Sequence, residues 1–118
     1  MRVLTLIKYS ELLGEPPESF GPGMAADLPA LDATITMVDT GSLLPTAVAG
    51  AVLRTTGGKA GVVDGPFTEA KEVVGGYSIS DVDTFEQAVE AARAFLEISA
   101  RNWPGWSGAA EVRQLAEF

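Results

Sequence analysis

Apolar residues alternate with polar ones, or run together in short stretches, in five segments that predict β-strands. These segments are residues 2–9, 47–54, 59–63, 73–82 and 110–115. The first segment is apolar on both alternating faces, which is typical of a central strand covered on both sides. The second and third flank Thr55-Thr56-Gly57-Gly58, a sequence that predicts a β-hairpin. Gly75 and Gly76 interrupt the fourth segment and indicate a bulge or the close approach of another element, for which we favour a neighbouring helix.

A first helix is predicted to begin at Pro29, because proline is tolerated in the first turn but costs about 3 kcal/mol in a helix interior. Asp27 is the expected N-cap and Gly41 the left-handed C-terminal cap. Four apolar side chains recur at helical spacing here: Leu28, Leu31, Ile35 and Val38. The preceding residues 10–23 hold three prolines and three glycines and predict a long loop. If residues 24–28 were helical as well, the helix would kink at Pro29.

A second helix, clearly amphipathic, is predicted to follow Asp83, its expected N-cap, with Glu86 in the reciprocal position of a capping box. One face is apolar and the opposite face is charged, with Glu97 and Arg101 in the favourable i,i+4 order. The loop at 102–108 follows, with two tryptophans in Trp-Pro-Gly-Trp. These indoles suit either a lid over a pocket or a dimer contact, and we favour the dimer contact.

The order of elements is typical of a split β-α-β fold, written βαββαβ, in which both helices cover one face of an antiparallel sheet. We therefore predict an α+β, ferredoxin-like fold and a single domain over residues 1–118. The face of the sheet without helices would expose valine, leucine, isoleucine and tyrosine side chains as a larger apolar patch than monomers usually carry. Pairing two such sheets face to face would cover it, so we expect a twofold homodimer.

The composition removes several classes of function. The net charge is −8, from 8 basic and 16 acidic residues, so nucleic acid is not an expected partner. Cysteine and histidine are both absent, which excludes disulfides, thiolate nucleophiles, imidazole bases and ordinary zinc sites. We expect no cofactor and no bound metal, although a hard cation held only by carboxylates stays open, without the acidic spacing of an EF-hand. Apolar runs are too short for a membrane span or a signal peptide, so we expect no membrane association and a cytoplasmic location.

Residues 64–72, Asp-Gly-Pro-Phe-Thr-Glu-Ala-Lys-Glu, are the strongest candidate for a functional site. Gly65 permits a positive φ and Pro66 fixes its own, so the carboxylate of Asp64 is held rigidly at the end of the third predicted strand. In a chain without histidine, Asp64 is the first choice as a catalytic base. The alternative is local: an aspartate at a turn also bonds its own backbone two residues on.

Other side chains are candidates for holding a substrate. Lys71 would bind an anion or stabilise a developing oxyanion, or else it keeps an exposed connector soluble together with its acidic neighbours. Arg113 would clamp a carboxylate, or else it pairs with Glu111 on the same face of its strand. Tyr9 and Tyr77 would each offer a hydroxyl at a strand, although most strand tyrosines pack with a wet tip.

The chain resembles the YCII-related, or DGPF-domain, proteins. The resemblance rests on residues 63–72, Val-Asp-Gly-Pro-Phe-Thr-Glu-Ala-Lys-Glu, followed by Gly75-Gly76-Tyr77, and it extends to the closing residues 111–114. It implies a ferredoxin-like fold that dimerises into an α/β barrel and an enzymatic role for the motif, with Pro66 and Phe67 as substrate contacts beside Asp64. In some relatives the residue before the Trp-Pro-Gly-Trp turn looks to be histidine, where this chain has Asn102, and other relatives look to pair a histidine with the aspartate of the motif. With this departure, either Asp64 acts alone or this member has lost the activity.

Two functions remain open. The first is a small-molecule enzyme, isomerase-like or hydrolase-like, that transfers protons with Asp64 as the base. The second is a non-catalytic ligand-binding or regulatory dimer, because relatives look linked to extracytoplasmic-function sigma factors and an acidic surface suits a basic protein partner.

Overall fold

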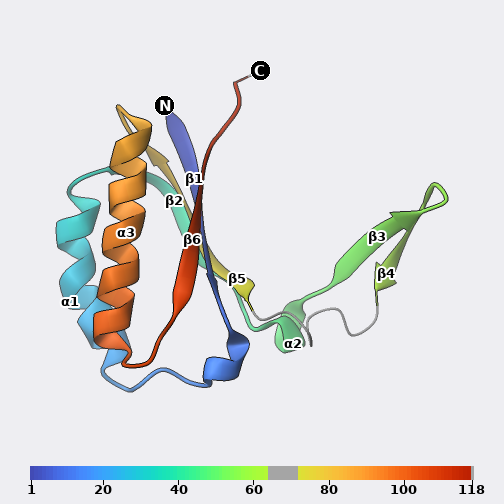
Figure 1. Cartoon of the computed structure of the whole chain (residues 1–118), viewed down its shortest axis with the longest axis horizontal. Helices are drawn as coiled ribbons and strands as arrows, with labels where there is room; N and C mark the ends of the chain where they lie inside the picture. The colour runs from blue at the N-terminus through green and yellow to red at the C-terminus, as the bar shows by residue number, and fades with distance from the viewer. Residues whose placement is uncertain (64–71, 118) are drawn as a thin grey trace.

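The computed structural model describes residues 1–63 and 72–117. Its elements in chain order are β1 (Arg2–Tyr9), the 3₁₀ turn η1 (Glu11–Leu13), α1 (Phe20–Asp32), β2 (Thr36–Ser42), α2 (Thr46–Ala49), β3 (Val52–Thr56), β4 (Lys59–Val63), β5 (Val73–Asp81), α3 (Phe85–Asn102) and β6 (Gly108–Gln114) (Figure 1). Within these residues, no helix is long and apolar enough to cross a bilayer.

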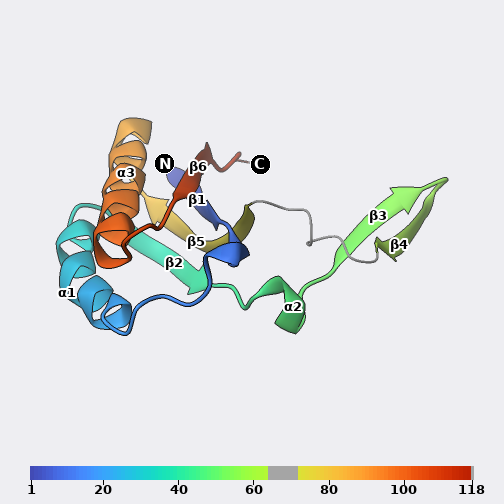
Figure 2. The ribbon, with the colours of Figure 1, turned by 60° about the horizontal axis from the view of Figure 1, so that its bottom comes forward.

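The main sheet has the strand order β2-β5-β1-β6, with every neighbouring pair antiparallel. Helices α1 and α3 lie side by side on the same face of it (Figures 1 and 2). This is the order of a ferredoxin-like sheet, so the predicted fold class is confirmed, as is the central place of the strand at residues 2–9. The other face of the sheet, here called the open face, carries no helix of the described chain.

The predicted position of the first helix, from Pro29 to the cap at Gly41, is wrong. Helix α1 begins at Phe20 and ends at Asp32 with Pro29 inside it, and residues 36–42 form strand β2. The backbone N–H of Thr34 donates to the carbonyl of Leu31 at 2.9 Å, and this turn ends the helix. Thr36, Val38 and Thr40 of this strand are β-branched, and such stiff side chains favour strands over helices. The predicted loop at 10–23 is correspondingly shorter and includes η1.

The predicted hairpin is present, but it does not belong to the main sheet. Its first strand is β3 and not residues 47–54, because residues 47–49 are part of helix α2. Among the described strands, β3 and β4 pair only with each other, through a turn in which Gly57 and Gly58 have φ values of 59° and 81°. The second strand of the ferredoxin-like sheet is therefore β2 and not the hairpin. We call α2 with β3 and β4, residues 46–63, the hairpin arm. In both views it projects from the side of the sheet away from the helices (Figures 1 and 2).

Helix α3 starts one residue later than predicted. Thr84, not Asp83, is the N-cap, and its hydroxyl accepts from the backbone N–H of Gln87 at 3.3 Å. The side chain of Gln87 accepts in return from the backbone N–H of Thr84 at 3.4 Å, so Gln87 takes the place expected for Glu86. At the other end Arg101 pairs with Asp27 of α1 at 3.1 Å, across the helix pair, instead of with Glu97.

The hydrophobic core lies at one end of the layer between sheet and helices. Val3, Val82 and Ala88 are buried there, with Ile35, Phe85 and Val112 packed around them. Val3 is fully buried, as expected for the central strand. Toward the other end of the same layer the side chains leave a cavity.

Candidate functional site

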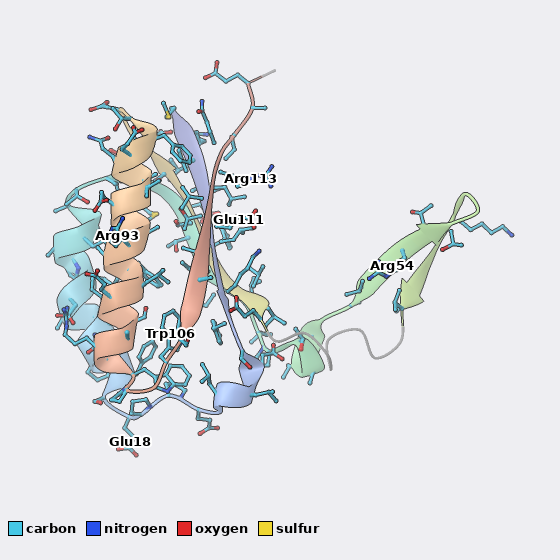
Figure 3. The ribbon with its side chains drawn as sticks, in the orientation of Figure 1. Glu18, Arg54, Arg93, Trp106, Glu111 and Arg113 are labelled. Carbon is cyan, nitrogen blue, oxygen red and sulfur yellow. The ribbon has the colours of Figure 1, made fainter. Side chains whose placement is uncertain are left out.

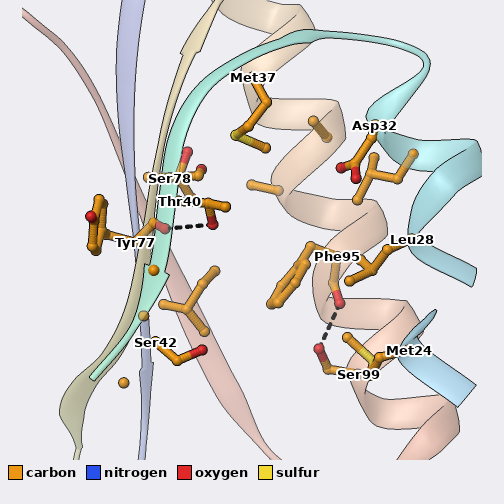
Figure 4. A pocket seen from close by; sticks show the side chains of 18 of the residues that line it. Met24, Leu28, Asp32, Met37, Thr40, Ser42, Tyr77, Ser78, Phe95 and Ser99 are labelled. Carbon is orange, nitrogen blue, oxygen red and sulfur yellow. Dashed lines mark hydrogen bonds between the residues drawn. The ribbon is translucent and has the colours of Figure 1, made fainter. Parts of the chain in front are cut away.

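A cavity of about 430 Å³ lies between the helix-covered face of the sheet and helices α1 and α3 (Figure 4). Most of its lining is apolar or aromatic. These side chains come from β1, α1, β2 with the residues on either side of it, α3 and the loop after α3: Ile7, Tyr9, Phe20, Met24, Leu28, Leu31, Ile35, Met37, Leu43, Ala88, Ala91, Ala92, Phe95, Trp103 and Trp106. The elements of the ferredoxin-like fold therefore form its walls, whereas the hairpin arm forms none of the lining named here.

A few polar side chains interrupt the apolar lining. They are Thr5, Asp32, Thr40, Ser42, Ser78, Ser80 and Ser99. Two of the hydroxyls already donate to backbone carbonyls, Thr40 to Tyr77 at 3.0 Å and Ser99 to Phe95 at 2.9 Å (Figure 4). Ser42 and Ser78 make no side-chain hydrogen bond to a described residue, so their hydroxyls are available to a ligand. Asp32, at the end of α1, supplies the one carboxylate among the lining residues of the described chain.

Tyr9 is the predicted site residue whose side chain lies at this cavity. Its ring covers Gly75 on β5 so closely that a β-carbon there would overlap it, and it packs against Trp106 with ring centroids 6.3 Å apart. The pairing of β1 with β5 skips Gly75, which marks a bulge. The close approach predicted at the paired glycines is therefore a tyrosine side chain and not a neighbouring helix.

Tyr77 and Arg113 lie on the open face, across the sheet from the cavity. The Tyr77 ring points away from the cavity (Figure 4), covers Gly41 and donates its hydroxyl to Asp39 at 3.0 Å. This hydrogen bond to a carboxylate, with the charge itself, raises the pKa of Tyr77. Gly41, expected as a helix cap, instead serves in β2 as the small residue beneath this ring.

Arg113 donates to Glu111 on its own strand at 3.4 Å, as the alternative reading expected. Lys8 of β1 donates to the same carboxylate at 2.8 Å. The hydrogen bond from Lys8 is the main cause that lowers the pKa of Glu111, and the bond from Arg113 adds to it. The structure thus separates Tyr9, at the cavity, from Tyr77 and Arg113, on the opposite face.

Asp64, Pro66, Phe67 and Lys71 lie outside the described residues. Their flanks are described: Val63 ends strand β4, and strand β5 begins at Val73. Gly75 and Gly76 of β5 line the cavity only a few positions after the motif.

Two further contributions to this end of the fold come from the tryptophans after α3 and from Glu11, and sequence reasoning missed the second of them. Trp103 and Trp106 line the cavity, and Trp103 packs edge-on against Phe20 with ring centroids 5.4 Å apart. The pocket role considered for these indoles therefore fits their position, and the favoured dimer contact stays a prediction. The carboxylate of Glu11 accepts hydrogen bonds from the backbone N–H and the hydroxyl of Thr46, at 2.9 and 2.7 Å. Both bonds lower the pKa of Glu11, and the bond from the hydroxyl is the larger cause. The Trp-Pro-Gly-Trp motif signalled the first; no local pattern signalled the second.

Asn102, the position at which some relatives look to have histidine, faces Asp27. Its amide donates to the carboxylate of Asp27 at 2.9 Å and to the carbonyl of Ile98 at 3.0 Å. The amide is the main cause, ahead of Arg101, that lowers the pKa of Asp27. In residues 1–63 and 72–117, no three acidic side chains gather closely enough to hold a metal ion.

The geometry defines a ferredoxin-like α+β protein with an apolar cavity between its sheet and its helices. A family model described as the YCII-related domain matches residues 1–118, and the chain belongs to this family. A curated relative from Rhizobium meliloti (strain 1021), an uncharacterised protein, is 40% identical over 76 residues, which cover 64% of this chain and 56% of the relative. The chain thus aligns with little more than half the length of that relative.

Proposed function

We propose that the protein binds a small, largely apolar organic molecule in the cavity between its sheet and its helices. The observation that carries this proposal is the combination of volume and lining. The cavity of about 430 Å³ falls within the range of about 300–1,000 Å³ that is usual for small-molecule sites. A mainly apolar wall with a few separated polar groups is the usual chemistry of such a site.

The ligand has an aromatic or branched apolar body and one or two hydrogen-bonding groups. Phe20, Phe95 and Trp103 favour contact with flat or bulky apolar groups. The hydroxyls of Ser42 and Ser78 orient a carbonyl or hydroxyl of the ligand. No lysine or arginine is among the lining residues of the described chain, so an acidic ligand would need Lys71, the cation proposed from the motif.

The reaction proposed for this ligand is proton transfer with Asp64 as the base, in an isomerase-like or hydrolase-like enzyme. Lys71 stabilises the developing negative charge, Tyr9 donates a hydrogen bond, and Pro66 and Phe67 contact the substrate. Two observations support this. The motif leads into β5, whose glycines line the cavity, and Tyr9 lies against the first of these glycines. Tyr77 and Arg113 are not contacts of this ligand in the proposal, because their side chains lie on the open face, across the sheet from the cavity.

The test separates binding from turnover. A thermal-shift screen over small aromatic and branched-chain organic acids, ketones and alcohols identifies a ligand, because a ligand at 100 times its Kd stabilises the folded state by about 2.7 kcal/mol. Asp64→Asn should then keep the ligand's Kd within about threefold and reduce turnover at least about a hundredfold, as general-base catalysis contributes. Equal turnover by the two proteins would exclude Asp64 as the base. Val63→Ile provides a control substitution beside the motif.

A non-catalytic ligand-binding or regulatory dimer is the second candidate. The scarcity of ionisable groups in the described lining favours it, because Asp32 is the one carboxylate there. In this case a ligand would bind wild type and Asp64→Asn equally, and neither would convert it.

We also propose a homodimer formed through the open face. Leu4 and Leu6 of β1 pair with Ile79 and Tyr77 of β5 on this face, so apolar side chains run across its two central strands. The Lys8–Glu111–Arg113 ion pairs and Asp39 surround them with charge. An apolar centre with a polar rim is the usual composition of a protein interface.

A further inference from the structure

The hairpin arm presents apolar side chains that no described part of its own chain covers. Leu53 and Val62 are directly paired across β3 and β4, and they are 62% and 65% exposed. Two more apolar side chains at the base of the arm, Leu44 and Val48, are 66% and 68% exposed. A two-stranded hairpin alone is at best marginally stable in water, so the arm needs a surface to pack against.

The arm and the rest of the molecule have opposite charge. Residues 46–63 contain Arg54 and Lys59 and no acidic residue, a net charge of +2. Residues 1–45 and 72–117, here called the body, contain five basic and fourteen acidic side chains, a net charge of −9. Neither Arg54 nor Lys59 forms an ion pair within the described residues. The arm is therefore electrostatically complementary to any copy of the body, including one in a second molecule.

The position of the arm allows it to reach such a copy. It projects on the side of the sheet that carries the open face, away from α1 and α3 (Figures 1 and 2). The accessible surface of the chain is 8023 Å², against roughly 6,100 Å² for a compact monomer of the same mass. This excess exceeds the roughly 800 Å² that each partner contributes to a standard interface.

We propose that the hairpin arm of one protomer docks on the body of a second copy of this chain, with Leu53 and Val62 against its apolar surface. Arg54 and Lys59 lie on the opposite face of the hairpin and attract the acidic side chains around the docked arm. A twofold axis makes the contact reciprocal, so two arms clasp two bodies. This inference rests on the proposed homodimer. It goes further in assigning the arm to the partner, so that each copy completes the hydrophobic packing of the other.

Photo-crosslinking tests the contact directly, because the chain has no cysteine and a single introduced thiol can be labelled selectively. Thr55→Cys lies on the same strand face as Leu53 and would carry a benzophenone (Figure 3 shows the arm with Arg54 labelled). The control is Ala100→Cys, at an exposed position of α3. In dimers mixed from light and heavy-isotope protein, crosslinks from residue 55 should join light to heavy peptides of the body. Crosslinks within one chain only, or none, would overturn the proposal.

Charge reversal tests the electrostatic part. Arg54→Glu should raise the Kd of the dimer at least roughly tenfold in sedimentation at low salt, because it repels the acidic body. Arg93→Glu makes the same charge change on the solvent face of α3 and should leave the Kd within about twofold. An equal change in the dimer Kd for Arg54→Glu and Arg93→Glu would refute the role of Arg54. Monomeric wild type would end both the homodimer and the arm contact, whereas a dimer indifferent to Arg54→Glu and without crosslinks would end the arm contact alone.

Discussion

Two glycines leave room for the two tyrosine rings of this fold. The rings of Tyr9 and Tyr77 each lie over a glycine of a neighbouring strand, Gly75 on the cavity side and Gly41 on the open face. A β-carbon at Gly41 would lie 2.7 Å from Cε1 of Tyr77, closer than real contacts allow. The two glycines thus make room for one tyrosine ring at the cavity and for the other at the open face, where the homodimer is proposed.

Gly75→Ala should destabilise the protein by about 1–3 kcal/mol, because the new methyl group overlaps the Tyr9 ring and forces it to move. Urea unfolding measures the change. Gly21→Ala, at a helical position with open space around it, should leave stability unchanged or raise it by up to about 1 kcal/mol. In a Tyr9→Ala background the cost of Gly75→Ala should fall, and the same cost in both backgrounds would contradict this role of Tyr9.

Individual helices and strands are held by contacts that join elements far apart in the sequence. Asp27 of α1 accepts from Arg101 and Asn102 of α3, and Glu11 accepts from the first residue of α2. Helix α3 also has its own start signal in the reciprocal hydrogen bonds of Thr84 and Gln87. Helix position therefore depends on both local caps and long-range polar contacts.

Thr84→Ala should cost about 1 kcal/mol of stability, because it removes the side-chain acceptor at the start of α3. Asp83→Ala should change stability by no more than about 0.5 kcal/mol, since the bond at this position uses the backbone N–H and not the carboxylate. Chemical denaturation of both variants compares the two candidate caps. A larger loss for Asp83→Ala would restore the cap predicted from the sequence.

The contact of Asp27 with Asn102 and Arg101 should make stability depend on pH. Because these donors lower the folded-state pKa of Asp27, the contact contributes fully above the unfolded pKa of about 3.9. Its contribution is lost as the pH falls through the lower folded value. The stability difference between wild type and Asn102→Ala should therefore narrow from pH 6 to pH 3 in urea titrations. A difference that stays constant over this range would show that the amide does not favour the charged carboxylate.

At the scale of the whole molecule, the two faces of the sheet differ in what covers them. One face encloses the cavity under the helices, and the other leaves apolar side chains uncovered. The radius of gyration is 16.1 Å, against about 13.5 Å for a compact domain of this length, because the arm extends from the body. Both the uncovered face and the extended arm support association with a second copy.

Ile79→Arg should raise the dimer Kd at least roughly a hundredfold, because it places an unpaired charge in the centre of the proposed interface. Ala100→Arg, at an exposed position on α3, is the matched control and should leave the Kd unchanged. Analytical ultracentrifugation across a concentration series measures both values. Dimers of equal strength would show that the open face is not the interface.

Much of the architecture follows from local patterns. The apolar segment at residues 2–9, the strand pattern at 73–82, the glycine turn of the hairpin and the amphipathic pattern of α3 correspond to elements of the structure. The stretch at 29–40 does not, because its apolar spacing fits a helix while its β-branched residues fit a strand. Pairing of β2 with β5 decides between these options, and such long-range pairing is invisible to a local reading.

The sequence by itself determined the fold class, the acidic charge, the absence of histidine and cysteine chemistry, and the family motif, because each depends on composition or short-range order. Tertiary structure decided which tyrosine faces the cavity and that both tryptophans line it. It also decided that the hairpin lies outside the main sheet and that Asp27 accepts hydrogen bonds from α3. The physical reason is that these properties depend on which strands pair and which side of the sheet the helices cover. Neither choice is encoded in any single segment.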